Sequence, residues 1–163
     1  MTEAAATRDV HPWVRDRHGR VGFGLEVFPI ETPEEPARAL LTAAELAEQL
    51  GFDSFWFGDH PAWGLDCWLH VAALAMRTDR IGPGINVACA LYRNPVLMAR
   101  LAADLDNLSN GRLILGLGIG WDENEFNNLG IPFPSVPQRQ EALEEAIAIM
   151  RGAWGQEPFS FEG

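Results

Sequence analysis

Basic residues are scarce in this sequence, which has 12 Lys and Arg residues against 23 Asp and Glu residues and a formal net charge of −11. A chain with this balance repels a phosphate backbone unless its basic side chains are clustered. The arginines near the start of the chain are interrupted by Glu3, Asp9 and Asp16. We therefore expect no nucleic-acid partner.

Long apolar runs are also missing. Residues 1–20 lack the apolar core of about seven or more residues that a secretory signal needs. Elsewhere no run approaches the roughly 20 residues of a membrane-spanning helix. These absences favour a cytoplasmic protein without a membrane partner. We interpret residues 1–20 as a flexible tail and residues 21–163 as the folded part.

Cysteine is rare, with two residues in the chain. Cys67 falls on a predicted helix and Cys89 on a predicted strand. The sequence has no C-x-x-C pair and no paired histidines near either residue, so it offers no metal-binding pattern. We expect two buried, reduced thiols and no metal.

A repeated unit is the most informative feature that is present. Strand-like runs begin near Val21, Asp53, Ile81 and Arg112, and a helical pattern follows each of them. The repeat is about 30 residues, which is the length of one βα unit. Strands that alternate with helices indicate a parallel sheet.

Capping signals and apolar spacing place the four helices. The first opens on a capping box at 32–35, buries one face and stops at Gly51; the second covers about 66–77. The third begins at Asn94 and Pro95 and ends at Gly111, and the fourth covers about 137–151. The predicted buried positions are Leu40, Ala44 and Ala47 in the first helix, Leu97, Leu101, Leu105 and Leu108 in the third, and Leu143, Ala146, Ile147 and Met150 in the fourth.

Two architectures accept this series of units, a closed eight-stranded barrel and an open, doubly wound sheet. The glycines at 116–120 look superficially like a dinucleotide-binding turn. That motif, however, is G-x-G-x-x-G and opens directly into a helix. Here Trp121 follows the last glycine and several prolines delay the next helix, so the barrel is favoured. The long stretch at 121–136 is then a candidate functional loop, because such barrels build their sites from βα loops.

Four segments at the strand ends resemble one family, the bacterial-luciferase-like monooxygenases, including their deazaflavin-dependent members. These segments are GFDSFWFGDH (51–60), IGPGINV (81–87), RNPVLMARLAADLDNLSNGRLILGLGIGW (93–121) and the following DENEF. The resemblance runs from about Val21 to the end of the chain. It implies a TIM (β/α)8 barrel of which this chain holds about the first four βα units.

The resemblance also implies site residues. Asp59 and His60 would be a catalytic pair, with His60 as acid or base and a neighbouring carboxylate orienting it; a plain loop histidine capped by Asp59 is the alternative. Trp63 and Trp121 would border the substrate, although Trp63 is equally suited to plugging the barrel mouth. The expected cofactor contacts are Gly84, Ile85, Asn86, Gly118, Gly120 and Asn124, with a non-prolyl cis peptide, or else an ordinary bulge, at Gly84-Ile85.

One departure from the family pattern concerns substrate. Deazaflavin-dependent sugar-phosphate dehydrogenases carry an acidic glutamate directly after the last glycine, where this chain has Trp121. Asp122, Glu123 and Glu125 follow closely, and one of them could substitute. That particular reaction is therefore not expected from the sequence.

The function implied is hydride transfer, or oxygen activation by reduced flavin, on a small organic substrate. Coenzyme F420 is slightly preferred over FMN, a separate reductase is a possible partner, and a homodimer is expected. The half barrel would be inactive by itself. The alternative from another class is a non-catalytic flavin-binding or half-barrel assembly module, because an isolated four-stranded parallel sheet leaves both outer strands unpaired.

Overall fold

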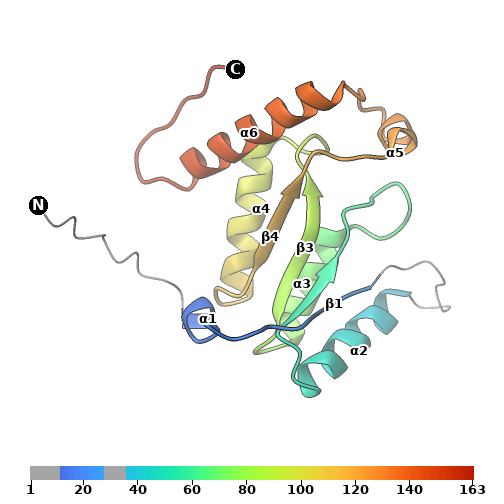
Figure 1. The fold of residues 1–163 in the computed structure, drawn as a ribbon, viewed down its shortest axis with the longest axis vertical. Coiled ribbons are helices and arrows are strands. Elements are labelled where there is room, and N and C mark those ends of the chain that lie inside the picture. The colour runs from blue at the N-terminus through green and yellow to red at the C-terminus, as the bar shows by residue number, and fades with distance from the viewer. Residues whose placement is uncertain (1–11, 28–35) are drawn as a thin grey trace, which may run out of the picture.

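The computed structural model describes residues 12–27 and 36–163 (Figure 1). Its centre is one parallel sheet in which the strands lie side by side in chain order. An open, doubly wound sheet reverses its strand order at a switch point. No reversal occurs among these four strands, so the sheet does not support the open-sheet alternative and its order is consistent with a β/α barrel wall. The strands are β1 (Gly24–Glu26), β2 (Ser54–Phe57), β3 (Gly82–Cys89) and β4 (Ile114–Gly118).

Each strand is followed by a long helix, which confirms the four predicted βα units. The four helices are α2 (Pro36–Gln49), α3 (Cys67–Arg77), α4 (Pro95–Leu108) and α6 (Val136–Ala153). The predicted cap at Asn94 forms as expected, and Asp66 caps α3 in the same way. Asn94 accepts the backbone N–H of Val96 at 2.9 Å, and Asp66 accepts that of Trp68 at 2.9 Å. The predicted capping box at 32–35 lies outside the described residues.

The core lies between the sheet and α2, α3 and α4. Alternate residues of each strand point to this side, as the period of two in a strand requires. On α2 the predicted face of Leu40, Ala44 and Ala47 is buried, and Gly51 follows with a φ of +87°. Helix α3 packs on α2, α4, β2 and β3, which explains why it is apolar nearly all round. The fully buried members of the core include Phe55, Val71, Leu74, Ile81, Ile85, Ala88 and Met98.

On the opposite face of the sheet, one large side chain covers the neighbouring strands. The indole of Trp56 lies across β1 and β3, where a Cβ at Gly24 or Gly84 would collide with it. Its Nε1 donates to Ser54 Oγ at 2.8 Å. The glycine at 84 therefore makes room for Trp56, which gives this position a packing role.

The buried faces of the later helices differ from the prediction. Helix α4 buries Met98, Ala99, Ala102 and Leu105, whereas Leu97, Leu101 and Leu108 are exposed. Helix α4 packs chiefly against α3 and α6, and these neighbours, not the spacing of the leucines, decide which face is buried. Helix α6 buries Ala146 and Met150, while Leu143 and Ile147 are only half-buried.

The stretch at 121–136 is not a loop throughout. It contains a short helix, α5 (Glu123–Asn128), which Asp122 begins by accepting the backbone N–H of Asn124 at 3.0 Å. Figure 1 shows α5 beyond the arrowheads of β3 and β4, at the carboxyl end of the sheet. This position brings the residues of α5 to the end of the sheet where βα loops form sites.

The N-terminal segment is not a free tail from Pro12 onward. Helix α1 (Pro12–Arg15) lies at the amino end of β3, where Trp13 Nε1 donates to the carbonyl of Arg80 at 3.0 Å. Arg17 also donates to that carbonyl at 3.3 Å and pairs with Asp53 at 3.4 Å. Residues 1–11 of the predicted tail lie outside the described residues. Within the described residues, no helix is long and apolar enough to cross a bilayer.

Candidate active site

The carboxyl ends of all four strands border one cavity of about 530 Å³, which we call the central cavity. Strand β1 contributes Glu26, and β3 contributes Asn86, Val87 and Cys89. The loops that follow β2, β3 and β4 complete the wall. The lining residues are Glu26, Asp59, His60, Trp63, Asn86, Val87, Cys89, Tyr92, Gly120 and Trp121.

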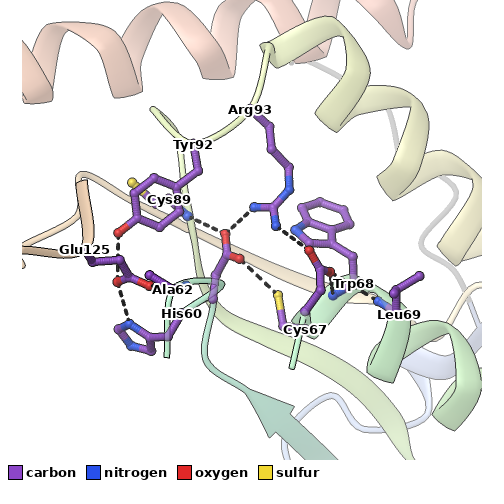
Figure 2. Close-up of polar contacts among 11 residues, drawn as sticks. His60, Ala62, Cys67, Trp68, Leu69, Cys89, Tyr92, Arg93 and Glu125 are labelled. Carbon is purple, nitrogen blue, oxygen red and sulfur yellow. Dashed lines mark hydrogen bonds and ion pairs between the residues drawn. The ribbon is translucent and has the colours of Figure 1, made fainter. Parts of the chain in front are cut away.

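His60 is held in this wall by a carboxylate from another element. Its Nδ1 lies 2.9 Å from Oε2 of Glu125, and 23% of its side chain is exposed against 1% for Glu125 (Figure 2). An ionised carboxylate only accepts hydrogen bonds. The proton of a neutral His60 therefore sits on Nδ1, which leaves Nε2 with the lone pair that a general base needs.

Glu125 is fixed by two further hydrogen bonds. Tyr92 donates its hydroxyl to Oε2 at 2.9 Å, and the backbone N–H of Ala62 donates to Oε1 at 3.3 Å. Burial raises the pKa of Tyr92 well above its usual value, and the hydrogen bond to Glu125 raises it further. Tyr92 thus stays a donor at neutral pH. Both oxygens of the buried carboxylate are satisfied, so its position is well determined.

Two tryptophans enclose the imidazole. The ring of Trp63 stacks on His60 with centroids 4.2 Å apart and planes 5° apart. Trp121 meets Trp63 edge to face at 5.7 Å and His60 at 6.2 Å. The structure therefore brings the three predicted residues His60, Trp63 and Trp121 together at one cavity. Both tryptophans remain more than half exposed at its rim.

Asp59 does not orient His60 as expected. One oxygen of its fully buried carboxylate accepts from Arg93 at 2.6 Å and from the backbone N–H of Cys89 at 3.2 Å. The other accepts from the thiol of Cys67 at 3.4 Å. Arg93 also donates to Asp66 at 3.0 Å, at the start of α3. Burial lowers the pKa of Arg93, but the bond and charge of Asp59 outweigh it, and the pKa is raised.

The predicted position of the cis peptide is also corrected. The non-prolyl cis bond joins Asn86 to Val87, two residues beyond Gly84-Ile85. The register between β3 and β4 shifts between Ile85 and Ala88, so an irregularity accompanies it. Asn86 faces the central cavity and donates to Glu26 at 3.0 Å, whereas Ile85 is fully buried on the helix side.

Of the other residues expected to contact the cofactor, some line the central cavity and others do not. A Cβ at Gly118 would come within 2.5 Å of Val87, so this glycine makes room for a neighbouring side chain. Gly120 lines the central cavity, with a φ of +71° that favours glycine. Asn124 lies on the exposed side of α5 and does not line the cavity. Gly84, Ile85, Gly118 and Asn124 are therefore not cavity residues, while Asn86 and Gly120 are.

Both cysteines are free and buried, as predicted. Burial raises the pKa of Cys89 to about 11, and it raises the pKa of Cys67 well above its usual value. Neither is a thiolate at neutral pH. No group of His, Cys, Asp and Glu that could hold a metal occurs among the described residues.

Sequence reasoning considered Glu125 only as one of three acidic residues and missed Tyr92 and Arg93 altogether. Glu125 and His60 are 65 positions apart, and no local pattern joins them. The available signal was that Glu125 is next to the apolar Phe126 on the short segment after β4. If that segment is a helix, one of its faces is buried, and Glu125 can lie on that face with Phe126. Arg93 gave no signal, because its position next to the helix cap at Asn94 is typical of a solvated loop.

A parallel sheet in chain order, with a histidine-containing cavity at its carboxyl end, is an arrangement typical of β/α-barrel proteins. The family follows from comparison with known proteins. The chain belongs to the luciferase-like monooxygenase family, whose sequence model matches residues 21–163.

Individual relatives share the fold and differ in their chemistry. The chain is 35% identical over 136 residues to an F420-dependent glucose-6-phosphate dehydrogenase from Microbacterium testaceum, covering 76% of this chain and 39% of the relative. It matches the solved monooxygenase RslO1 from Streptomyces bottropensis with a TM-score of 0.75 at 28% identity, over 88% of this chain and 46% of that one.

A third match is the oxygenating constituent of 3,6-diketocamphane monooxygenase from Pseudomonas putida, which was solved in complex with FMN. Its TM-score is 0.76 at 24% identity, and the match covers 87% of this chain and 41% of that one. At this identity the likeness establishes the fold alone. The chain spans less than half the length of each of these three proteins.

Proposed function

We propose that this chain forms the first four βα units of an eight-stranded TIM barrel enzyme that uses a flavin or deazaflavin. The enzyme would transfer a hydride, or activate oxygen through reduced flavin, on a small organic substrate. The observation that carries the proposal is the bond from His60 Nδ1 to the buried Glu125, at a cavity that all four strand ends border. Family membership supplies the class of cofactor.

The central cavity fits a planar ring. Its volume of about 530 Å³ lies within the usual range for small-molecule sites, and its wall combines aromatic and aliphatic faces with a few polar groups. Asn86, Val87 and Gly120 would hold the ring, and His60 and Trp121 would border it. We propose F420 before FMN, because the dehydrogenase from Microbacterium testaceum is F420-dependent. Our first preference rested on the Asp59-His60 and Asn124 matches; Asp59 is already bonded to Arg93, Cys89 and Cys67, and Asn124 is not among the residues that line the central cavity.

The residues of this chain would position and transfer a proton. The bound cofactor would supply the hydride or oxygen chemistry. His60 takes up or releases a proton at Nε2, because Glu125 holds the other ring nitrogen as a donor. Trp63 covers one face of the imidazole and so helps to fix the orientation of the ring.

Cofactor binding is tested by absorbance titration of the 163-residue chain with FMN and with F420. Binding of either one with a shifted spectrum is expected. Trp121→Ala should weaken it, whereas Trp154→Ala, a matched exposed tryptophan far from the cavity, should not. Equal effects of the two substitutions, or no spectral change with either cofactor, would overturn the proposal.

Catalysis is tested with the cofactor that binds, in a chain that continues through the remaining four βα units, because the half barrel is expected to be inactive by itself. With small alcohols and aldehydes as substrates, or with oxygen and reduced FMN, the absorbance of the cofactor should change with time. His60→Asn should lower that rate by about 100-fold or more. An unchanged rate would remove His60 from the proposed role.

A second candidate function rests on the edges of the sheet. Strands β1 and β4 each pair on one side only in the described sheet. Unpaired edges and an uncovered face favour association, so we also propose a homodimer in which two half barrels cover each other. In that case the chain is a flavin-binding or assembly module. A stable dimer that binds cofactor but shows no turnover would favour this function.

A further inference from the structure

A second cavity, which we call the side cavity, lies behind His60 and Trp63. Its volume is about 430 Å³. It borders the end of β2 and the helices α2 and α3, which pack on the outer side of the sheet. His60 and Trp63 line both cavities, so their stacked rings form the partition between them. The lining residues are Val27, Leu40, Phe57, Gly58, His60, Trp63, Gly64, Leu65, Cys67 and His70.

His70 is the polar side chain inside this cavity, and it is 8% exposed. Its Nδ1 lies 2.9 Å from the carbonyl of Asp66, one turn earlier in α3. A carbonyl only accepts, so Nδ1 carries the proton and Nε2 carries a lone pair. The ring packs against Phe57 with centroids 5.5 Å apart. No residue in the described part of the chain donates to Nε2.

The other lining side chains among the described residues offer His70 no proton. The thiol of Cys67 donates to Asp59 at 3.4 Å and is therefore already used. The imidazole of His60 uses its own Nδ1 proton on Glu125. The indole of Trp63 lies at the rim and is 54% exposed. Val27, Leu40, Phe57 and Leu65 are apolar.

We propose that the side cavity binds an apolar molecule that carries one hydroxyl group, such as an aliphatic alcohol, with the hydroxyl donating to His70 Nε2. The Nε2 lone pair has no partner among the described residues, and a ligand hydroxyl would supply the hydrogen-bond donor. The apolar walls bury the rest of the ligand. This site does not depend on the proposed function, since it requires no cofactor, although its ligand lies against the partition that His60 and Trp63 form.

The test compares cyclohexanol with cyclohexanone, which has almost the same size but donates no hydrogen bond. Both are titrated into the 15N-labelled chain without added cofactor. Cyclohexanol should bind about two- to tenfold more tightly, as expected for one net hydrogen bond between neutral groups. It should also shift the 15N resonance of His70 Nε2, which cyclohexanone should leave nearly unchanged.

Two variants and a control complete the test. His70→Phe should abolish the preference for cyclohexanol, and Leu65→Trp should weaken both probes by filling the cavity. Leu69→Ala, on the exposed side of α3, should change neither affinity. Equal affinities of the two probes for the native chain, or an unmoved Nε2 resonance at saturating cyclohexanol, would overturn the proposal. The resonance gives this answer even if His70→Phe fails to fold.

Discussion

Glu125 and Asp59 are both buried carboxylates beside the candidate active site, yet only Glu125 bonds to His60. Asp59 instead joins the loop after β3 to the start of α3 through Arg93. Glu125 therefore sets the protonation of the imidazole, whereas Asp59 holds the backbone that carries it. The two roles lead to different predictions.

Glu125→Gln should change the tautomer of His60. An amide can either accept from Nδ1–H or donate to a bare Nδ1, so both neutral tautomers become possible. In the native chain, 15N NMR should show the proton of neutral His60 on Nδ1 alone; in the variant it should show a mixture. Glu123→Gln, on the exposed side of the same helix, is the control and should leave the native pattern. A single native tautomer in Glu125→Gln would contradict this role.

Asp59→Asn should lower the free energy of unfolding by about 2 kcal/mol, because it removes a charge-assisted hydrogen bond and leaves the partly buried Arg93 with Asp66 as its remaining ion pair. Asp104→Asn, which breaks the exposed pair with Arg100, should cost less than about 0.5 kcal/mol. Urea denaturation measures both. Similar values for the two variants would show that the pair with Arg93 does not stabilise the fold.

At this scale, sequence reasoning found the residues that stand at strand ends and missed their partners. His60, Trp63 and Trp121 follow β2 and β4 directly, so their place at the cavity followed from the fold. The partner of His60 did not, because adjacent residues after a strand point in different directions. Asp59 turns toward α3 while His60 turns toward α5, and only three-dimensional packing decides this.

At the scale of elements, a side chain of one element accepts hydrogen bonds from the backbone N–H groups next to another. Glu48 of α2 accepts the backbone N–H groups of Asp79, Arg80 and Ile81, just before β3, at 2.7 to 3.2 Å. Burial raises the pKa of Glu48, but these three backbone hydrogen bonds outweigh it and lower the pKa below 4.5. The carboxylate thus fixes the start of β3 relative to α2.

Glu48→Gln should therefore destabilise the fold at pH 7 by about 1 kcal/mol, a value that allows for partial solvent screening. A carboxylate with a lowered pKa stabilises the fold above its unfolded pKa, and this contribution is lost as the pH falls through the folded value. The difference from the native chain should shrink below pH 4.5 in urea denaturation. A difference that is constant with pH would contradict this prediction. The control is Glu141→Gln, at an exposed position of α6.

The buried face of α4, which differs from the predicted one, gives a second prediction at the scale of elements. Met98→Ala should cost about 2 to 5 kcal/mol, because Met98 is fully buried. Leu97→Ala should cost less than about 1 kcal/mol, since 63% of Leu97 is exposed. Thermal unfolding of the two variants decides between the faces. A larger loss for Leu97→Ala would restore the leucine stripe that the sequence predicted.

The positions of strands and helices were predictable, whereas the faces of the helices were less so. Strand starts and helix caps depend on local chemistry, such as Asn94 and Asp66 accepting from the next turn. The face of a helix depends on what it packs against. In α4 the spacing of the leucines was a correct helical pattern on the wrong side, because packing against α3 and α6 decides which face is buried.

For the whole molecule, the sheet edges govern behaviour in solution. Strands β1 and β4 have free edges in the described sheet, and the face that carries Trp56 and Val87 has no helix layer. We predict that the 163-residue chain associates, as a dimer or as larger aggregates, in multi-angle light scattering. A monomer that stays stable and sharply melting at high concentration would contradict this prediction.

The central claim is that the four strand ends converge on a site for a planar cofactor beside His60. The most direct measurement is a titration of the 15N-labelled chain with FMN and with F420, followed by backbone amide shifts. The account predicts that the largest shifts occur at His60, Val87 and Gly120, with little change at Arg80 and Gly111 at the opposite end of the sheet. Shifts centred on Arg80 and Gly111, or none with either cofactor, would contradict it.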